Sequence, residues 1–344
     1  MIDYLIVGQG IAGSFLSATC DKQKLSFRVI SNDIPGASHV AAGLFNPVVL
    51  KRFKKVFNAD KSLKHLLLLL NYVENCLDSK IQLNQQIIRK LNSVEEQNQW
   101  VENSDKLTLR EYLGEIITDS VGSIESKYGY GLVHCAGRID VQLFISKWHQ
   151  YLEEKNNLIS EEFDFNNLKV TPTFIEYRGI QYKNLIFCEG TKSLNNPYFS
   201  EIPIIPNKGE YIKIKTENLP QYIINSRHFI IPNSETEALI GATYQPRDKN
   251  IEPTDKAKNE LLQFWATQSN AKATVIHQYA GLRPTVNDRR PIVGTHREHS
   301  TLHLLNGLGS RGLLHAPWLS YQLLNFIESG TPLHPECDIK RFYQ

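Results

Sequence analysis

The chain has 344 residues, of which 41% are hydrophobic and 22% are charged, and its formal net charge at pH 7 is +2. This length and apolar content predict about two packed domains and exclude a globally disordered chain. The near balance of 38 basic and 36 acidic residues excludes a broad electrostatic surface for nucleic acid or membrane, so a partner of either kind needs a local patch.

The first thirty residues predict a β-α-β unit. Residues 4–7 are a short continuous apolar run, typical of a strand buried on both faces, and they lead into the glycine-rich segment 8–13. A helix is expected from there to about residue 20, and a second strand at 27–30. The next expected elements are a helix at 61–78, mixed helix and strand at 81–115, an amphipathic helix at 141–155 and a buried strand at 184–188.

The pattern changes in the second half of the chain. Residues 209–216, 222–231 and 237–244 alternate between apolar and polar, which predicts an antiparallel sheet. Thr254 is placed to cap a helix that follows it. The remaining expected elements are that helix at about 255–269, strands at 274–282 and 301–305, and a final helix from the glycine-rich segment 307–312 to about 329. Strands typical of a parallel sheet thus come at the start, middle and end, which predicts two interleaved domains.

The cysteines and the start of the chain bear on its compartment. The cysteines are odd in number, lie far apart and show no metal-ligand spacing, which predicts reduced thiols and no metal site. Residues 1–3 lead directly into an apolar strand without the basic segment of a secretory signal. The longest apolar run, Leu66–Leu70, is far short of the ~20 residues that span a bilayer. We therefore expect a cytoplasmic protein without a membrane partner.

Three glycines predict a dinucleotide site. Gly8, Gly10 and Gly13 follow a predicted strand and open a predicted helix, which is the context that gives the GxGxxG pattern its meaning. The first glycine permits a tight turn, the second lets the backbone approach a pyrophosphate, and the third allows close helix–strand packing. The helix start at Ile11 and Ala12 offers N–H groups and a partial positive charge to that pyrophosphate. The alternative is a glycine-rich turn that binds no ligand.

The acidic residue that usually binds the adenosine ribose is missing from the end of the second strand. That strand ends in Ile30-Ser31-Asn32-Asp33, so Ser31 stands where glutamate is usual. Ser31 and Asn32 are both able to hydrogen-bond a ribose hydroxyl, whereas Asp33 lies two residues late. The choice among these three residues stays open.

Four segments, in this order, resemble the FAD-dependent D-amino-acid-oxidase and glycine-oxidase superfamily. They are DYLIVGQGIAGS with the following GASHVAAGLFNP, then NLIFCEGTKSL, AGLRPTVNDRRPIVG and NGLGSRGLLHAP. The resemblance implies an FAD cofactor, held non-covalently because the GLRP segment has no cysteine. The flavin contacts that it implies, besides the glycine-rich loop, are Ser38, Ala41, Ala42, Gly43, Leu44, Gly190, Gly309, Ser310, Gly312 and Leu313.

The resemblance also implies the architecture. We expect an α/β fold with a Rossmann-type FAD-binding domain and an interleaved α+β substrate domain built on an antiparallel sheet. The expected FAD-binding domain is discontinuous and consists of residues 1–60, 137–205 and 283–344. The expected substrate domain consists of residues 61–136 and 206–282.

Within the superfamily, GLGSRGL followed by AP is most similar to one branch. That branch is the FAD-dependent oxidoreductase domain of the bifunctional tRNA 5-methylaminomethyl-2-thiouridine biosynthesis protein, which oxidatively removes a carboxymethyl group from a wobble-uridine side chain. Glycine oxidases carry Arg-Asn where this chain has Ser310-Arg311. Arg311 is therefore displaced by one residue from their arginine.

Three residues are the expected catalytic contacts. Arg283 matches the superfamily's substrate-binding arginine, which holds a carboxylate through a bidentate fork. Its alternative role is a turn brace paired with Asp288. Arg311 is expected to contact substrate or flavin, with a loop salt bridge as the alternative. Tyr244 is expected to line the pocket, as is Phe229, although aromatic residues in sheets are usually core.

These features leave three functional hypotheses. The first is oxidation of a C–N bond in a carboxylate-bearing amine by hydride transfer to FAD, in its sharpest form on a modified tRNA wobble uridine. The second is an oxidase or dehydrogenase of free glycine, sarcosine, proline or a D-amino acid. The third is a flavoprotein that serves as a binding module without turnover. The four cations within residues 51–55 could hold RNA phosphates if the substrate is a tRNA, and the alternative is that they form a solvated basic face. No oligomeric state is predicted.

Overall fold

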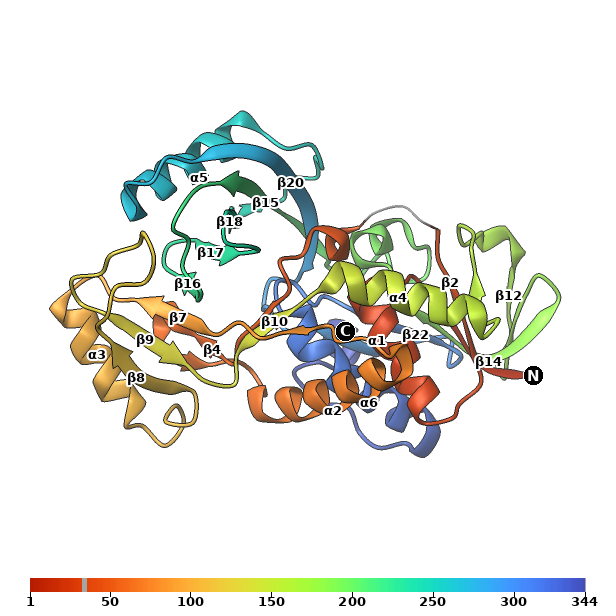
Figure 1. Cartoon of the computed structure of the whole chain (residues 1–344). Helices are drawn as coiled ribbons and strands as arrows, with labels where there is room; N and C mark the ends of the chain where they lie inside the picture. Colours follow the sequence, from red (N-terminus) through yellow and green to blue (C-terminus); the bar gives the residue numbers. More distant parts are fainter. Residues whose placement is uncertain (33–35, 344) are drawn as a thin grey trace.

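The computed structural model describes residues 1–32 and 36–343, so the ribose candidate Asp33 lies outside the described residues. Figure 1 shows two lobes, each built around its own large sheet. One contains a mostly parallel sheet with helices α1, α4 and α6, and the other contains an antiparallel sheet with helix α5. The predicted fold class, a Rossmann-type α/β unit interleaved with an antiparallel α+β unit, is confirmed.

The first sheet is built around strand β1 (Ile2–Val7), which is flanked on both sides by parallel strands. Leu5 and Ile6 are fully buried, as the continuous apolar run predicts. The parallel strands, from one edge, are β11 (Leu158–Ile159), β2 (Phe27–Ile30), β1, β14 (Ile180–Phe187) and β22 (Leu302–Asn306). Antiparallel strands extend it, namely β12 (Leu168–Val170), β13 (Ile175–Tyr177) and β21 (Ile292–Thr295).

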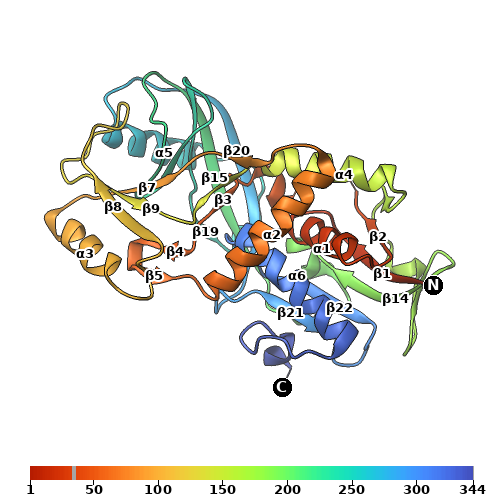
Figure 2. The same cartoon turned by 60° about the horizontal axis from the view of Figure 1, so that its bottom comes forward.

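Four helices accompany this sheet. They are α1 (Ile11–Lys22), α2 (Ala59–Leu77), α4 (Val141–Glu154) and α6 (Gly312–Ser329). Helix α2 packs against α1 and α6, as Figure 2 shows, with Leu66, Leu69 and Leu70 of its leucine run buried. This packing lies beside the parallel sheet, although the sequence places 61–136 in the substrate domain. The predicted domain boundaries themselves stay a prediction.

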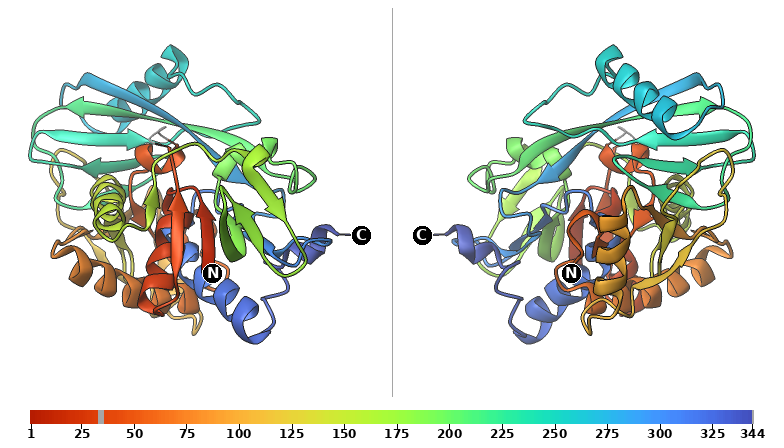
Figure 3. Two further views of the ribbon diagram at one scale, coloured as in Figure 1. Left: turned by 90° about the vertical axis from the view of Figure 1, so that its right-hand side faces the viewer. Right: turned by 90° about the vertical axis from the view of Figure 1, so that its left-hand side faces the viewer.

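The second sheet is mostly antiparallel and lies between α5 (Asp255–Gln268) and the rest of the molecule (Figure 3). Its long central pair is β15 (Ile205–Lys215) and β20 (Thr274–Thr285). The other strands are β16 (Ile223–Asn225), β17 (Phe229–Pro232), β18 (Glu237–Gly241), β19 (Gln245–Pro246), β7 (Ile87–Lys90), β8 (Leu113–Ile117) and β9 (Tyr130–Val133). Ile212 and Ile214 pack with Leu261 and Phe264 of α5, so the even-numbered face of β15 meets that helix.

Smaller elements connect the lobes. A short sheet joins β3 (Leu44–Phe45), β10 (Gly137–Ile139) and β6 (Gln82–Leu83), and a two-stranded ribbon joins β4 (Val48–Val49) and β5 (Lys54–Lys55). The remaining helical elements are α3 (Val94–Ser104), η1 (Ala37–Val40), η2 (Leu50–Arg52), η3 (Phe165–Asn167), η4 (Gly190–Asn195) and η5 (Ile339–Phe342).

The predicted cap of α5 is confirmed, since the Thr254 hydroxyl accepts a hydrogen bond from the Ala257 amide at 3.2 Å. Helix α4 is capped in the same way by Asp140, whose carboxylate accepts from the Leu143 amide at 2.9 Å. Among residues 1–32 and 36–343, no helix combines the length and apolar character that crossing a bilayer requires.

Candidate active site

The glycine-rich loop lies at the carboxyl end of β1 and is closely packed on its neighbours. Gly8 has a φ of +99°, and a Cβ on it would lie 2.7 Å from the carbonyl oxygen of Cys188. A Cβ on Gly13 would clash with the carbonyl oxygen of Gly8. These positions tolerate only glycine, because the chain turns tightly and the helix sits directly against the strand.

The start of α1 is tied to the segment that the sequence assigns to the flavin. Gly10 is the N-cap and supplies no side-chain cap, and the Ile11 amide donates instead to the Ser38 hydroxyl at 3.0 Å. Ser38 belongs to η1. The N–H groups of the first helical turn have no partner within the helix, so this end offers donors to an anion.

The next part of that segment is attached to β10. Arg138 donates through Nε to the Ala42 carbonyl at 3.0 Å, and the Ile139 amide donates to the Gly43 carbonyl at 2.8 Å. Ala42 is buried, whereas Ala41 and Leu44 are half-buried. Arg138 was not foreseen as a site residue, because only the pairing of β3 with β10 brings it to this segment.

The C-terminal glycine-rich loop meets both the start of α1 and the end of β20. A Cβ on Gly312 would lie 3.4 Å from the Ile11 side chain, so the N-termini of α6 and α1 lie close together. The Gly309 amide donates to the Pro284 carbonyl at 2.8 Å. Leu313 is buried in the first turn of α6, and Ser310 is exposed.

Arg283 lies on the face of the antiparallel sheet that looks away from α5. Its guanidinium lies directly over Gly209 of the paired strand, where a Cβ would clash with it, and Nη1 donates to the Thr243 carbonyl at 3.4 Å. Asp288 instead accepts from Arg341 at 3.1 Å. The alternative of an Arg283–Asp288 brace is therefore wrong, and the Arg283 fork is left without an acidic partner among the described residues.

The sheet face that carries Arg283 also carries two aromatic residues. Gly281, two residues earlier on the same face, lies against Val40 of η1, which turns this face toward the predicted flavin segment. Tyr211 and Phe229 share the face, because both pair with Gly241 in the sheet register. The alternation of residues 205–215 contained the signal for Tyr211, although the sequence analysis did not single it out.

Tyr244 differs from these two aromatic residues because 60% of its surface is exposed. Its role as a pocket residue stays a prediction, as do the catalytic roles of Arg283 and Arg311. Asn207, which pairs directly with Arg283, is fully buried, and its amide finds no hydrogen-bond partner among residues 1–32 and 36–343.

Arg311 is a desolvated cation at the N-cap of α6. It donates through Nη1 to the Asn46 carbonyl at 3.1 Å, and it forms no ion pair with an acidic side chain in the part of the chain that the structure describes. Burial lowers its pKa to about 10. The alternative of a loop salt bridge is therefore not seen, and the uncompensated positive charge favours an anionic group at this place.

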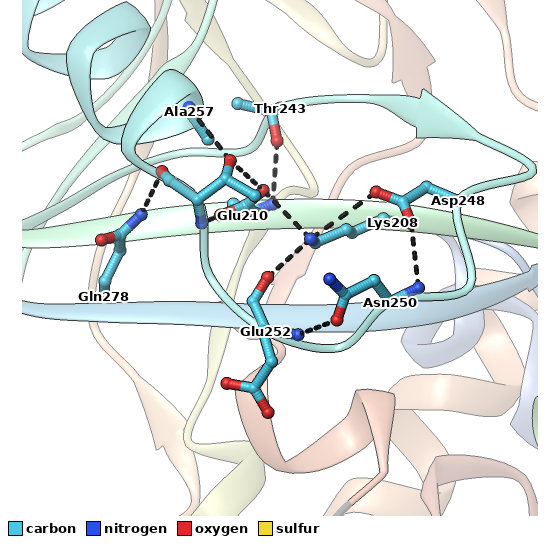
Figure 4. Close-up of polar contacts among 9 residues, drawn as sticks. Lys208, Glu210, Thr243, Asp248, Asn250, Glu252, Ala257 and Gln278 are labelled. Atoms are coloured by element: carbon cyan, nitrogen blue, oxygen red, sulfur yellow. Dashed lines mark hydrogen bonds and ion pairs between the residues drawn. The ribbon is translucent and has the colours of Figure 1, made fainter.

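A buried ion pair lies on the other face of β15, the face toward α5, and fixes this strand beneath Arg283 (Figure 4). Lys208 and Glu210 are fully buried, and the distance from Lys208 Nζ to Glu210 Oε1 is 3.5 Å. The Lys208 ammonium donates to the Glu252 carbonyl at 2.6 Å, and the Glu210 carboxylate accepts from the Thr254 amide and hydroxyl at 2.6 and 2.9 Å. Gly209, between the two charged residues, is thereby held at the position over which Arg283 lies.

Glu189, directly after β14, is a half-buried residue whose carboxyl group was not predicted as part of the site. It accepts from the Asn196 amide at 2.7 Å, and its burial raises its pKa to about 7. A raised pKa means that ionisation of Glu189 opposes folding above about pH 7, while below the ordinary value of 4.5 the penalty is absent.

We expect Glu189→Gln to increase the free energy of unfolding by about 3 kcal/mol at pH 8, because the buried charge is removed. The gain should shrink toward zero as the pH falls below 4.5. Urea unfolding of both proteins across this pH range measures it, with Glu153→Gln, at an exposed carboxyl of α4, as the control. A gain that does not change with pH contradicts the assignment.

The glycine-rich loop at the end of β1, the helix that it opens and the parallel strands on both sides of β1 define a dinucleotide-binding α/β protein. The family model described as DAO, FAD dependent oxidoreductase, matches residues 3–323. The chain belongs to this FAD-dependent family, and the resemblance inferred from its motifs is confirmed.

The chain is similar in sequence to both kinds of enzyme that its motifs indicate. It is 26% identical over 136 residues to the bifunctional tRNA 5-methylaminomethyl-2-thiouridine biosynthesis protein MnmC of Marinobacter nauticus, covering 36% of this chain and 22% of that protein. It is 31% identical over 136 residues to a glycine oxidase of Pseudomonas putida, covering 38% of this chain and 37% of that enzyme. The matches thus span well under half the length of these relatives.

Solved structures share the fold over nearly the whole chain. Glycine oxidase from Bacillus cereus ATCC 14579 superposes with a TM-score of 0.76 at 19% identity, covering 96% of each chain. Iminodiacetate oxidase from Chelativorans sp. BNC1 superposes with a TM-score of 0.74 at 17% identity, also covering 96% of each chain. At such identities the likeness establishes the fold alone.

The residues present fit FAD. At Gly8 and Gly13 the loop leaves no room for a side chain, so the backbone itself faces the site, and the starts of α1 and α6 adjoin each other and offer N–H donors to an anionic group. Around Gly190, a Cβ would meet no described heavy atom within 4 Å, which leaves space beside the loop.

Proposed function

We propose that this chain oxidises the C–N bond of an amine that carries a carboxylate. The observation that carries the proposal is the Arg283 guanidinium, which has no acidic partner among residues 1–32 and 36–343 and lies on the sheet face toward η1. Arg283 holds the substrate carboxylate as a fork, and Tyr211 and Phe229 wall the amine off from water. When bound, FAD supplies the hydride acceptor. Non-covalent attachment of FAD and a cytoplasmic location remain predictions.

Relatives and structural neighbours support this substrate class by their names. Glycine and iminodiacetate are both amines that carry a carboxylate on the adjacent carbon, and the tRNA biosynthesis protein acts in a pathway to a methylaminomethyl group. The class therefore unites the free amino acid and the modified tRNA as alternative substrates.

One observation favours the tRNA form. Lys51, Arg52 and Lys54 are exposed on η2 and β5, directly after the flavin segment. Lys55, also exposed, is engaged with Asp60 at 2.7 Å. Three available cations on one short segment suit contacts to RNA phosphates beside the site. A small free amine remains the alternative substrate.

Anaerobic reduction of the bound flavin separates these possibilities. Loss of the visible flavin band with glycine, sarcosine, proline or a D-amino acid indicates a free amine substrate. Loss only with tRNA carrying carboxymethylaminomethyluridine, weakened by salt, indicates the tRNA substrate. If none of these amines reduces the flavin, the proposed function is wrong and a binding module without turnover is favoured.

A further inference from the structure

Strand β2 ends at Ile30, and the two described residues that follow it, Ser31 and Asn32, have different hydrogen-bond partners. The Ser31 hydroxyl donates to the neighbouring Asn32 carbonyl at 3.2 Å, so its hydrogen is already used in a local hydrogen bond. The Asn32 amide oxygen points elsewhere and accepts from the ammonium of Lys192 at 3.3 Å. These partners are 160 residues apart in the chain.

The Asn32–Lys192 contact crosses the carboxyl end of β1. Asn32 follows β2 and Lys192 lies in η4 after β14, and these two strands pair with β1 on opposite sides. Since adjacent strands lie about 4.8 Å apart, the contact bridges a span of roughly 10 Å. The structure beneath the bridge is the glycine-rich loop, which begins at the end of β1.

The turn that carries Lys192 is held firmly. Asn306, at the end of β22, donates to the Gly190 carbonyl at 2.8 Å and to the Ser193 hydroxyl at 2.9 Å. The Ser193 hydroxyl donates in turn to the Gly190 carbonyl at 2.8 Å. Lys192 itself is exposed, so its ammonium remains reachable while its backbone is fixed.

The charge at this place suits an anion. Lys192 is an exposed cation in the turn after β14. The nearby Glu189 carboxylate accepts a hydrogen bond from Asn196, and desolvation raises its pKa to about 7, so it adds little negative charge at neutral pH. A diphosphate on the loop therefore meets a positive charge from Lys192 in addition to the helix N-terminus.

We propose that Asn32 and Lys192 form a clasp across the glycine-rich loop that binds the adenosine diphosphate half of FAD. The Asn32 amide binds a ribose hydroxyl, and the Lys192 ammonium binds oxygens of the diphosphate. The clasp takes the place of the carboxylate that normally ends the second strand of this unit. It depends on the family's cofactor and not on the proposed substrate.

Binding of FAD to the deflavinated full-length protein tests the clasp, with flavin fluorescence as the readout. Lys192→Met is expected to raise the Kd for FAD roughly tenfold at low salt, since a charged hydrogen bond is lost. The change should shrink at high salt, and Lys192→Arg should retain most of the affinity. Asn32→Ala should weaken FAD binding to a smaller extent.

Two controls locate the effect. Riboflavin has the same ring system without the adenosine diphosphate, so its Kd should be equal for the wild-type protein and Lys192→Met. Lys169→Met, at an exposed lysine of β12, should leave both constants unchanged. The clasp is wrong if Lys192→Met binds FAD within twofold of wild type, or if FAD and riboflavin lose affinity equally. A protein that no amine reduces, but whose FAD affinity depends on Lys192, refutes the proposed function alone.

Discussion

Replacing Arg283 with leucine is expected to lower kcat/KM for a carboxylate-bearing amine by ~10²-fold or more while FAD stays bound. Loss of a charged partner to a desolvated carboxylate costs about 3 kcal/mol, which corresponds to that factor. Arg283 touches no part of the glycine-rich loop in any described hydrogen bond, so the flavin spectrum should be unchanged. Steady-state kinetics on the substrate that reduces the flavin measures the loss.

The matched control for Arg283 is Arg227→Leu, in the turn between β16 and β17, where the side chain is 73% exposed and paired with Glu260. Its kinetics should equal those of the wild type. The kcat/KM of Arg283→Lys should lie between the values of the wild type and Arg283→Leu, because an ammonium group keeps the charge but lacks the planar fork. An unchanged rate for Arg283→Leu removes this residue from the substrate site.

Replacing Lys208 with methionine is expected to reduce the free energy of unfolding by about 3–5 kcal/mol, because Glu210 then keeps a buried charge without its cation. The remaining hydrogen bonds from Thr254 do not replace that charge. The loss should also loosen Gly209 beneath Arg283, so KM for the amine should rise. Chemical denaturation measures the first effect and kinetics the second.

Lys213→Met provides the comparison for Lys208. It lies on the same strand, but its ion pair with Glu237 is partly exposed, so its removal should cost no more than about 1 kcal/mol. The double variant Lys208→Met with Glu210→Gln should be destabilised by less than the sum of the single losses, because no lone buried charge remains. Additive losses would show that the two charges do not interact.

The local elements of this fold were predictable because their signals are short-range. The apolar run before Gly8 predicted β1 as a doubly buried strand, and Thr254 predicted the start of α5. The alternation in the second half predicted the antiparallel strands, although β15 and β20 extend further than expected, to residues 205 and 285. The segment expected as one strand at 222–231 is instead a hairpin of β16 and β17. In each case neighbours in the sequence determine the structure.

The site contacts were not predictable because they join distant segments. The placement of the Arg283 fork over Gly209 depends on the register of β15 with β20, which no single segment encodes. Lys192 meets Asn32 only after β1 has paired on both sides. Likewise, the packing of α2 on α1 and α6 depends on the final helix of the chain.

The strand order has a consequence for when the cofactor can be captured. During synthesis, β1 and β2 leave the ribosome early, but the other edge of β1 stays unpaired until β14 is made. Strand β22 and the start of α6 come only after residue 300. For most of its translation, a nascent chain therefore has the glycine-rich loop but lacks β22 and the start of α6, which lies beside the start of α1 in the folded protein. We therefore expect FAD to bind late in the maturation of this protein, after the start of α6 has been made, so that a shortage of flavin leaves fully translated chains without cofactor.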